Sequence, residues 1–151
     1  MKTVLIATDG SESGRAAVET GLEFAADEAA RAVIARVTSF AEFGMSWDAP
    51  LDNPPQRMPQ PEDDAVLAEA LLLAAERGVA AKAELLVGYP AKQIVRLANE
   101  IDADVIVVGS RPLGPLTRAI VGSTSRAILE LTGRPVLIVN DSSVRAPVLT
   151  P

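Results

Sequence analysis

Short apolar runs and longer amphipathic stretches alternate along the chain. The apolar runs are rich in valine, isoleucine and leucine and end at turn residues, which is the pattern of buried strands. They predict strands over residues 3–8, 31–37, 81–88, 104–110 and 134–140. The stretches between them place apolar residues at helical spacing, and they predict helices over residues 13–26, 62–77, 90–101 and 123–133.

This order of elements predicts an α/β fold. A helix separates almost every pair of strands, and parallel strands need such crossover connections. We therefore expect a doubly wound, five-stranded, mostly parallel sheet with helices on both faces. Ligands of such sheets bind at the carboxyl ends of the strands, where the strand order reverses. The two strand ends richest in turn and hydroxyl residues are "ATDGSESG", which begins at Ala7, and "GSRPLGPL", which begins at Gly109.

Composition narrows the possible chemistry. The chain has 151 residues, of which 48% are apolar and 23% charged, and this predicts one globular domain over residues 1–141 with a flexible tail over 142–151. The sequence contains neither cysteine nor histidine. Disulfides, thiolate chemistry and cysteine-based metal sites are therefore excluded, and the commonest general base is missing. These absences argue against hydrolases, proteases and zinc proteins.

Charge and hydropathy argue against nucleic-acid and membrane partners. The net charge of −6 and the isoelectric point near 4.7 give no general attraction to nucleic acids or anionic lipids. The first apolar run is too short for a signal peptide, and no run reaches the roughly 18 residues of a membrane span. We expect a cytoplasmic protein without a nucleic-acid or membrane partner.

Residues 38–61 form a proline-rich loop in this prediction. The segment contains five prolines, a density that no regular element tolerates, and three of the five aromatic residues of the chain. Two interpretations remain open. The loop covers a pocket or a partner, or its aromatic side chains pack against the body of the domain.

The segment from Val107 to Leu129 has the order of a phosphate-binding loop. An apolar strand leads into a loop with several glycines, and a helix then opens with three consecutive hydroxyl residues, Ser123–Ser125. N-capping needs only one hydroxyl, so three favour an anion site or a phosphorylation target. However, Pro112 and Pro115 lack the backbone N–H groups that bind phosphate. A Walker A lysine and a G-x-G-x-x-G fingerprint are both missing, which argues against an ordinary P-loop or dinucleotide site.

The chain resembles the universal stress protein family over Lys2 to Asn140. The resemblance rests on "VLIATDGSESGRAAVETGLEFA", "YPAKQIVRLANEIDADVIVVGSRP" and "VGSTSRAILELTGRPVLIVN". It implies a Rossmann-like, adenine nucleotide alpha hydrolase-like fold. Many members bind ATP through the signature G-x2-G-x9-G-[ST]. Gly109 matches its first glycine and Gly122 with Ser123 its closing pair, whereas Pro112 replaces the second glycine, with Gly114 two places later.

The resemblance also implies the rest of the site. Asp9 matches a family aspartate expected near the ribose, the base or a bound Mg²⁺; its alternative role is to cap the turn before the first helix. Val37 matches a position whose backbone meets the adenine edge, and it follows Arg36 where the family often has histidine. The candidate cofactor-binding residues are Ala7, Thr8, Asp9, Val37, Gly109, Arg111, Gly114, Gly122, Ser123 and Thr124, with Asp9 also the candidate metal ligand.

Two arginines lie in the loop between the signature residues. Arg111 and Arg118 could supply the positive charge that proline cannot, because guanidinium pairs well with phosphate. The alternative is that both are solvated surface residues.

Three functions follow from these patterns together with what the resemblance implies. The first is a stress-response regulator that binds ATP or a related adenine nucleotide with Mg²⁺. The second is an interaction module of the same fold that binds no nucleotide and acts through protein contacts. The third, an enzyme, would be limited to slow ATP hydrolysis or autophosphorylation.

The last strand predicts self-association. Residues 136–140, "VLIVN", form an apolar strand expected at a sheet edge, and an exposed apolar edge tends to pair with another strand. The family resemblance implies a homodimer through this strand, alongside an unknown protein partner.

Overall fold

The structure is a computed structural model that describes residues 2–39, 60–110 and 122–140. In chain order its elements are β1 (Thr3–Ala7), α1 (Glu12–Asp27), β2 (Arg31–Thr38), the 3-10 turn η2 (Pro61–Asp63), α2 (Ala65–Glu76), β3 (Ala81–Val87), α3 (Pro90–Glu100), β4 (Val105–Gly109), α4 (Ser123–Leu131) and β5 (Val136–Val139).

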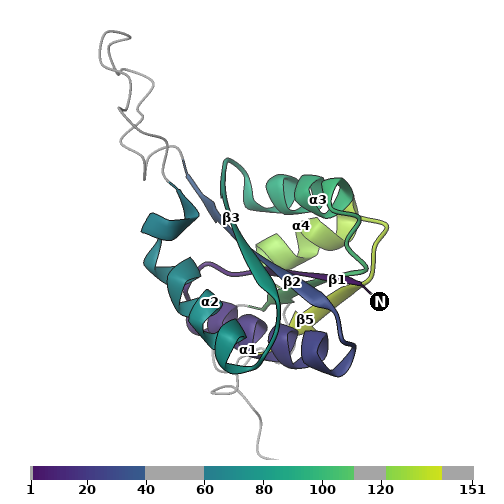
Figure 1. The fold of residues 1–151 in the computed structure, drawn as a ribbon. Helices are drawn as coiled ribbons and strands as arrows, with labels where there is room; N and C mark the ends of the chain where they lie inside the picture. Colours follow the sequence, from purple (N-terminus) through teal and green to yellow (C-terminus); the bar gives the residue numbers. More distant parts are fainter. Residues whose placement is uncertain (1, 40–59, 111–121, 141–151) are drawn as a thin grey trace, which may run out of the picture.

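The strands form one sheet in the order β3-β2-β1-β4-β5. Every neighbouring pair is parallel, which confirms the predicted doubly wound α/β fold. Helices α1 and α2 lie on one face of the sheet, and α3 and α4 lie side by side on the other (Figure 1). Strands β3 and β5 are the two edges of this sheet.

Alternation along the strands builds two cores. In β1 every residue is buried. Val4 and Ile6 pack into the core beneath α1 and α2, whereas Leu5 packs with Ile94 of α3 and Ile128 of α4. Successive side chains of a strand point to opposite faces, so a strand covered on both sides is apolar throughout. This explains why the central strands have continuous apolar sequences.

The predicted helix over 62–77 begins later in the structure. Asp64 has an extended backbone, with φ −94° and ψ 117°, and its Oδ1 accepts a hydrogen bond from the N–H of Leu67 at 3.0 Å. Asp64 is therefore the N-cap of α2. Glu62 and Asp63 belong to the separate turn η2 rather than to the first turn of the helix.

The C-terminal elements are shorter than predicted. Helix α4 ends at Leu131 because Thr132 is extended, with φ −107° and ψ 146°. Gly133 follows it without the positive φ of a left-handed helix end. Strand β5 covers four of the seven residues predicted.

Two predicted segments lie mostly outside the described residues. Of the proline-rich loop, the structure describes only residues 38–39 and 60–61, and the tail from 142 onward is not described. Within 2–39, 60–110 and 122–140, no helix is long and apolar enough to cross a membrane.

Candidate functional site

The carboxyl ends of β1 and β4 meet at the reversal of strand order. From β1 the chain passes through α1 to β2 on one side, while β4 lies on the other side of β1. Ala7 is in register with Val108, so Thr8 and Gly109 are neighbours beyond the strand ends. This is the position at which doubly wound sheets bind ligands.

The turn from β1 to α1 is held by its own polar groups. Thr8 is buried; its N–H donates to the Ala35 carbonyl at 3.0 Å, and its Oγ1 accepts from the Gly10 N–H at 3.3 Å. The Oδ1 of Asp9 accepts from the Ser11 N–H at 2.9 Å and from the Ser11 hydroxyl. Asp9 itself is exposed at the strand end. Its carboxylate thus stabilises the turn, in line with the capping alternative, and remains at the surface.

Ser11 is the N-cap of α1. Its Oγ accepts from the Gly14 N–H at 3.2 Å, and its backbone is extended. Gly14 lies directly beneath the turn, since a Cβ there would lie 2.8 Å from both Asp9 Oδ1 and Thr8 Oγ1. The start of the helix therefore packs closely under the candidate ligand residues.

Gly109 is required by packing. A Cβ at this position would lie 2.5 Å from the carbonyl carbon of Ser13 and 3.0 Å from its Cβ. The first turn of α1 therefore presses directly on the end of β4, and only glycine fits between them. The first glycine of the sequence signature has a structural cause that is independent of any ligand.

The start of α4 combines one buried and two accessible hydroxyls. Ser125 is 1% exposed, and its Oγ donates to the Gly109 carbonyl at 3.0 Å, which fastens α4 to the end of β4. Ser123 is exposed and Thr124 half-buried. Gly122 is the N-cap and has no side chain that could accept a hydrogen bond from the first N–H groups of the helix. This helix start can therefore donate to an anion.

The carboxyl end of strand β2 also belongs to the predicted site. Val37 is half-buried and in register with Leu86 of β3. Ala7 is buried in the core beneath α3 and α4, so the β1 end can contribute only its backbone there. Together these positions bring the described part of the predicted site to the carboxyl end of the sheet.

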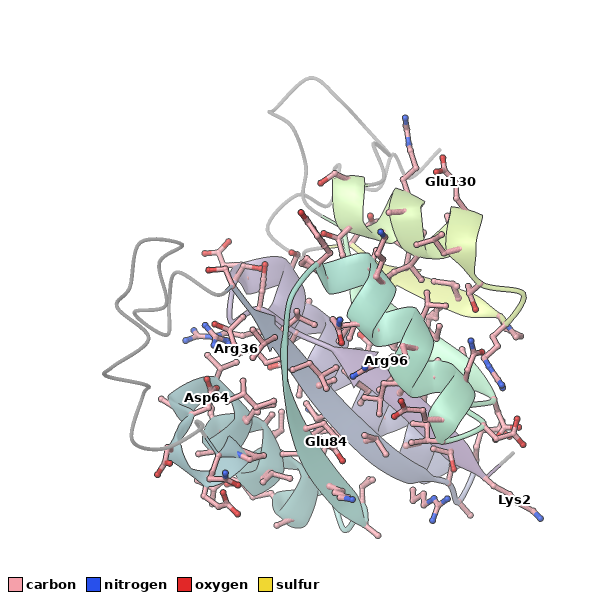
Figure 2. The ribbon with its side chains drawn as sticks, turned by 90° about the horizontal axis from the view of Figure 1, so that it is seen from above. Lys2, Arg36, Asp64, Glu84, Arg96 and Glu130 are labelled. Atoms are coloured by element: carbon pink, nitrogen blue, oxygen red, sulfur yellow. The ribbon has the colours of Figure 1, made fainter. Side chains whose placement is uncertain are left out.

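Arg36 points toward α2 and forms an ion pair that the sequence did not indicate. Its Nη1 lies 2.9 Å from Asp64 Oδ2, and the two side chains are 22% and 13% exposed. Figure 2 shows the pair beside the start of α2. Within the described ranges, Nε of Arg36 is buried without a hydrogen-bond partner. The pair joins residues 28 positions apart, and no local pattern signals such a contact.

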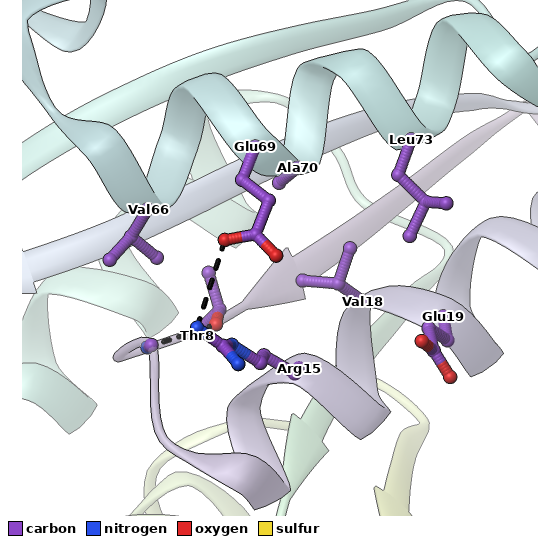
Figure 3. A pocket seen from close by; sticks show the side chains of 9 residues that line it. Thr8, Arg15, Val18, Glu19, Val66, Glu69, Ala70 and Leu73 are labelled. Atoms are coloured by element: carbon purple, nitrogen blue, oxygen red, sulfur yellow. Dashed lines mark hydrogen bonds and ion pairs between the residues drawn. The ribbon is translucent and has the colours of Figure 1, made fainter.

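A groove between α1 and α2 adjoins the carboxyl end of the sheet (Figure 3). The space along the groove, counted together with the open solvent at its mouth, is about 430 Å³, and Thr8 and Gly10 of the β1–α1 turn form part of its wall. Apolar side chains of both helices line most of the rest, together with Glu19, and Arg15 forms an ion pair with Glu69 at 3.8 Å across the groove. Sequence analysis missed this groove because its lining comes from two helices far apart in the chain.

Arg111 and Gly114, like Pro112, Pro115 and Arg118, lie outside the described residues. In the part of the chain that is described, no three acidic residues cluster in a way that could hold a metal ion. A carboxylate such as Asp9 suits Mg²⁺ that arrives with phosphate oxygens, because Mg²⁺ is usually held by one or two carboxylates together with phosphate and water.

Comparison with known proteins places the chain in a family. A solved universal stress protein in complex with cAMP has a TM-score of 0.67 and 29% identity, and the match covers 93% of this chain and 98% of that one. Two proteins of Bacillus subtilis, universal stress protein YxiE and stress response protein NhaX, are 31% and 30% identical. Each match covers 90% of this chain, and 97% and 96% of the relatives. The model of the universal stress protein family matches residues 1–140, and the chain therefore belongs to this family.

Proposed function

We propose that this chain is a stress-response regulator that binds an adenine nucleotide, with ATP and Mg²⁺ as the first candidates, across the carboxyl ends of β1, β2 and β4. The observation that carries the proposal is the meeting of the Thr8–Asp9 turn, Gly109 and the uncapped start of α4 at the reversal of strand order. The cAMP complex of the 29% identical universal stress protein supports the same ligand class.

Each part of the nucleotide has a candidate contact. The phosphates would accept from the N–H groups at the start of α4 and from the hydroxyls of Ser123 and Thr124. The adenine edge would meet the backbone at Val37, and Asp9 would contact the ribose or hold Mg²⁺. Arg111 and Gly114 would complete the phosphate loop. Binding would then alter contacts with a second copy or with a partner protein.

Calorimetric titration of ATP with Mg²⁺ tests this site. We expect binding to the wild type and at least tenfold weaker binding to Gly122→Val, since a branched side chain at the N-cap obstructs the approach of a phosphate. Gly133→Val is the matched control, because it places the same side chain at the other end of α4, where a Cβ meets nothing within 4 Å. Equal affinity of the wild type and Gly122→Val would refute the site.

Pro112 favours a second function, that of an interaction module without a nucleotide. Losing one charge-assisted hydrogen bond costs about 1.5–3 kcal/mol, or roughly ten- to a hundredfold in affinity. Pro112→Gly titrated beside the wild type separates the two functions. Binding by both proteins supports the nucleotide sensor, whereas binding by the glycine variant alone means that this protein has lost its ligand and acts through protein partners.

We also propose a homodimer through β5. The two edges of the sheet differ: β3 carries Lys82 and Glu84, charges that discourage edge pairing, whereas all four residues of β5 are apolar and half-buried. Because the Val139 carbonyl bonds inward to Ser110, the alternate residue Ile138 has its backbone groups toward the open edge.

Light scattering at tens of micromolar tests the dimer. We expect a dimeric wild type and a monomeric Ile138→Pro, since proline removes an outward N–H. Ala83→Pro makes the same change on the β3 edge and should remain dimeric. Circular dichroism must show both variants folded, and a monomeric wild type would refute the β5 interface.

A further inference from the structure

An exposed aromatic side chain lies at the carboxyl end of the sheet and has no part in the site described so far. Tyr89 connects β3 to α3 and is 75% exposed, more than any other exposed large apolar residue of the described chain. It is the only tyrosine in a sequence that is just 3% aromatic. Neither core uses its ring, since it belongs to neither buried cluster.

The fold brings Tyr89 close to the end of β2. The N–H of Gly88 donates to the Thr38 carbonyl at 3.0 Å, so the chain leaves β3 directly beside the residue that follows Val37. Val37 is in register with Leu86, and Tyr89 follows Leu86 by three residues, after the turn at Gly88, as the N-cap of α3. Tyr89 therefore lies at the carboxyl end of the sheet, on the connection that passes beside the end of β2.

The first turns of α3 and α4 lie at two places along the carboxyl end of the sheet. Both follow a parallel strand, so both begin at the carboxyl end of the sheet, and they lie side by side on one face (Figures 1 and 2). The start of α4 offers donors to phosphate, and the start of α3 offers the aromatic ring. A nucleotide with its phosphates at α4 and its base toward β2 would place the base beside Tyr89.

The backbone of Tyr89 is held in place before any ligand binds. Pro90 follows it and disfavours helical conformations at Tyr89, which has φ −79° and ψ 121°. Gly88 has φ +132°, and a Cβ there would lie 3.1 Å from Gln93 Nε2, so the turn packs tightly on the first turn of α3. The Lys92 ammonium lies 5.6 Å from the ring centroid, over the tyrosine ring, which is a cation–π distance.

We propose that Tyr89 stacks on the base of the bound nucleotide and determines the preference for a purine. This inference rests on the proposed function. Tyr89 is 75% exposed, stacking of a base on an aromatic side chain contributes substantially to affinity, and modest preferences among bases come from differences in stacking strength. Tyr89 is a specificity residue in this arrangement, and α4 supplies the phosphate contacts.

Affinities of Tyr89→Ala and Tyr89→Phe test the inference. Titrated with Mg²⁺ and ATP, Tyr89→Ala should bind about tenfold more weakly than the wild type, and its ratio of ATP to UTP affinity should fall. Tyr89→Phe should keep both values because it keeps the ring. Tripolyphosphate, which has no base, should bind Tyr89→Ala and the wild type equally. Arg96→Ala is the control on the same helix, at an exposed residue paired with Glu100.

A second measurement observes the ring directly. Because the chain has one tyrosine, protein labelled with ¹³C-tyrosine gives one set of ring signals. ATP should move them upfield through the ring current of a stacked base, and tripolyphosphate should leave them in place. If the wild type binds no ATP, the proposed function fails and the inference fails with it. If the wild type binds ATP but Tyr89→Ala keeps its affinity and the ring signals do not move, the inference alone is refuted.

Discussion

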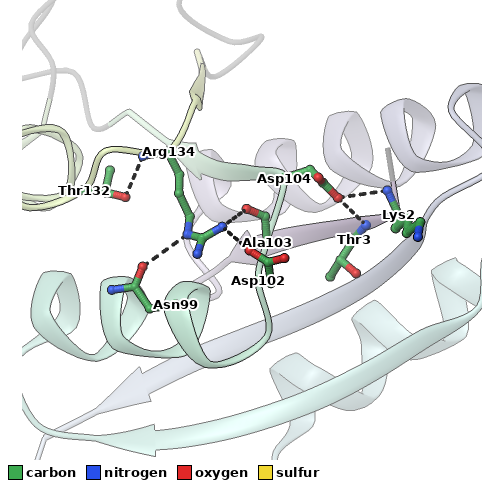
Figure 4. Close-up of polar contacts among 8 residues, drawn as sticks. All are labelled: Lys2, Thr3, Asn99, Asp102, Ala103, Asp104, Thr132 and Arg134. Atoms are coloured by element: carbon green, nitrogen blue, oxygen red, sulfur yellow. Dashed lines mark hydrogen bonds and ion pairs between the residues drawn. The ribbon is translucent and has the colours of Figure 1, made fainter.

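The two ends of the parallel sheet are built from different kinds of contacts. At the amino end, polar side chains bond to the backbone and to one another (Figure 4). Asp104 Oδ2 accepts from the N–H groups of Lys2 and Thr3, each at 2.9 Å, and Arg31 Nε donates to Thr3 Oγ1 at 2.9 Å. These polar groups therefore form their hydrogen bonds with other groups of the protein.

Arg134 extends this network across two loops. Its Nη1 donates to the Ala103 carbonyl at 2.7 Å and to Asp102 Oδ1 at 3.0 Å, and its Nε donates to Asn99 Oδ1 at 3.2 Å. The loop before β5 is thereby fastened to the loop before β4. Several donors of one guanidinium are satisfied within the protein, which is typical of a structural arginine.

The carboxyl end also has charged side-chain contacts, at Asp9 and in the Arg36–Asp64 pair, but where β4 meets α1 and α4 it uses glycine, backbone and hydroxyl groups. Gly109 admits the first turn of α1, and α4 begins without a side-chain cap. Folding thus satisfies polar groups of the amino end, whereas at the carboxyl end it leaves the start of α4 without a side-chain cap. Substitutions at both ends of the sheet test how cleanly stability and binding divide between them.

Gly109→Ala should have the largest effect on stability. It tests the division between the ends because Gly109 belongs to the carboxyl end and yet is required by packing. The added Cβ would overlap the Ser13 backbone, which cannot move without shifting α1, so we expect a loss of about 3 kcal/mol in the free energy of unfolding. Urea denaturation measures it. Gly133→Ala is the matched control, as its Cβ meets nothing within 4 Å. If the two variants were equally stable, the close approach of α1 to β4 would be disproved.

Arg134→Ala should have the second largest effect, a loss of about 2 kcal/mol in the free energy of unfolding, because the Ala103 carbonyl and Asn99 lose a charged donor. We expect unchanged ATP affinity, since the residue lies at the opposite end of the sheet. Arg96→Ala breaks an exposed ion pair with Glu100 and should cost less than about 0.5 kcal/mol. A drop in ATP affinity for Arg134→Ala would show that the two ends are coupled.

Ser125→Ala should cost about 1 kcal/mol, the value of one buried hydrogen bond. The Gly109 carbonyl loses its donor, and the start of α4 is held less firmly. Ser123→Ala should leave the unfolding free energy nearly unchanged, because that hydroxyl is exposed, and should weaken ATP binding instead. The opposite pattern in these two readouts would reverse the roles assigned to the two serines.

These two serines also show how far sequence reasoning reaches. The strands, the helices and the meeting of the carboxyl ends of β1 and β4 could be predicted, because apolar spacing reports burial directly. The three hydroxyls of Ser123–Ser125 look alike in the sequence, and their roles depend on how α4 is rotated against β4. Likewise, three consecutive acids precede α2, and only the extended backbone of Asp64 selects it as the cap.

Contacts between distant segments were beyond prediction for the same reason. The closeness of Gly109 to Ser13, the Arg36–Asp64 pair and the groove between α1 and α2 all depend on how elements pack. The sequence signature relates Gly109 to a ligand alone, whereas its packing role appears only once α1 lies across β4. Short-range patterns specify elements, and tertiary distances specify which residues of those elements meet.

Asp104→Asn should have the smallest effect, and its size should depend on pH. Hydrogen bonds from the backbone N–H groups of Lys2 and then Thr3 hold the pKa of the Asp104 carboxyl below its usual value of 3.8. A carboxyl whose pKa is lowered by folding contributes stability above its unfolded-state pKa and loses that contribution as the pH falls through the folded value. The wild type should therefore be slightly more stable than Asp104→Asn at neutral pH, and the difference should shrink below about pH 4. Urea midpoints of both proteins across this range measure it, and a difference that stays constant with pH would mean that the charge of Asp104 does not hold the amino end together.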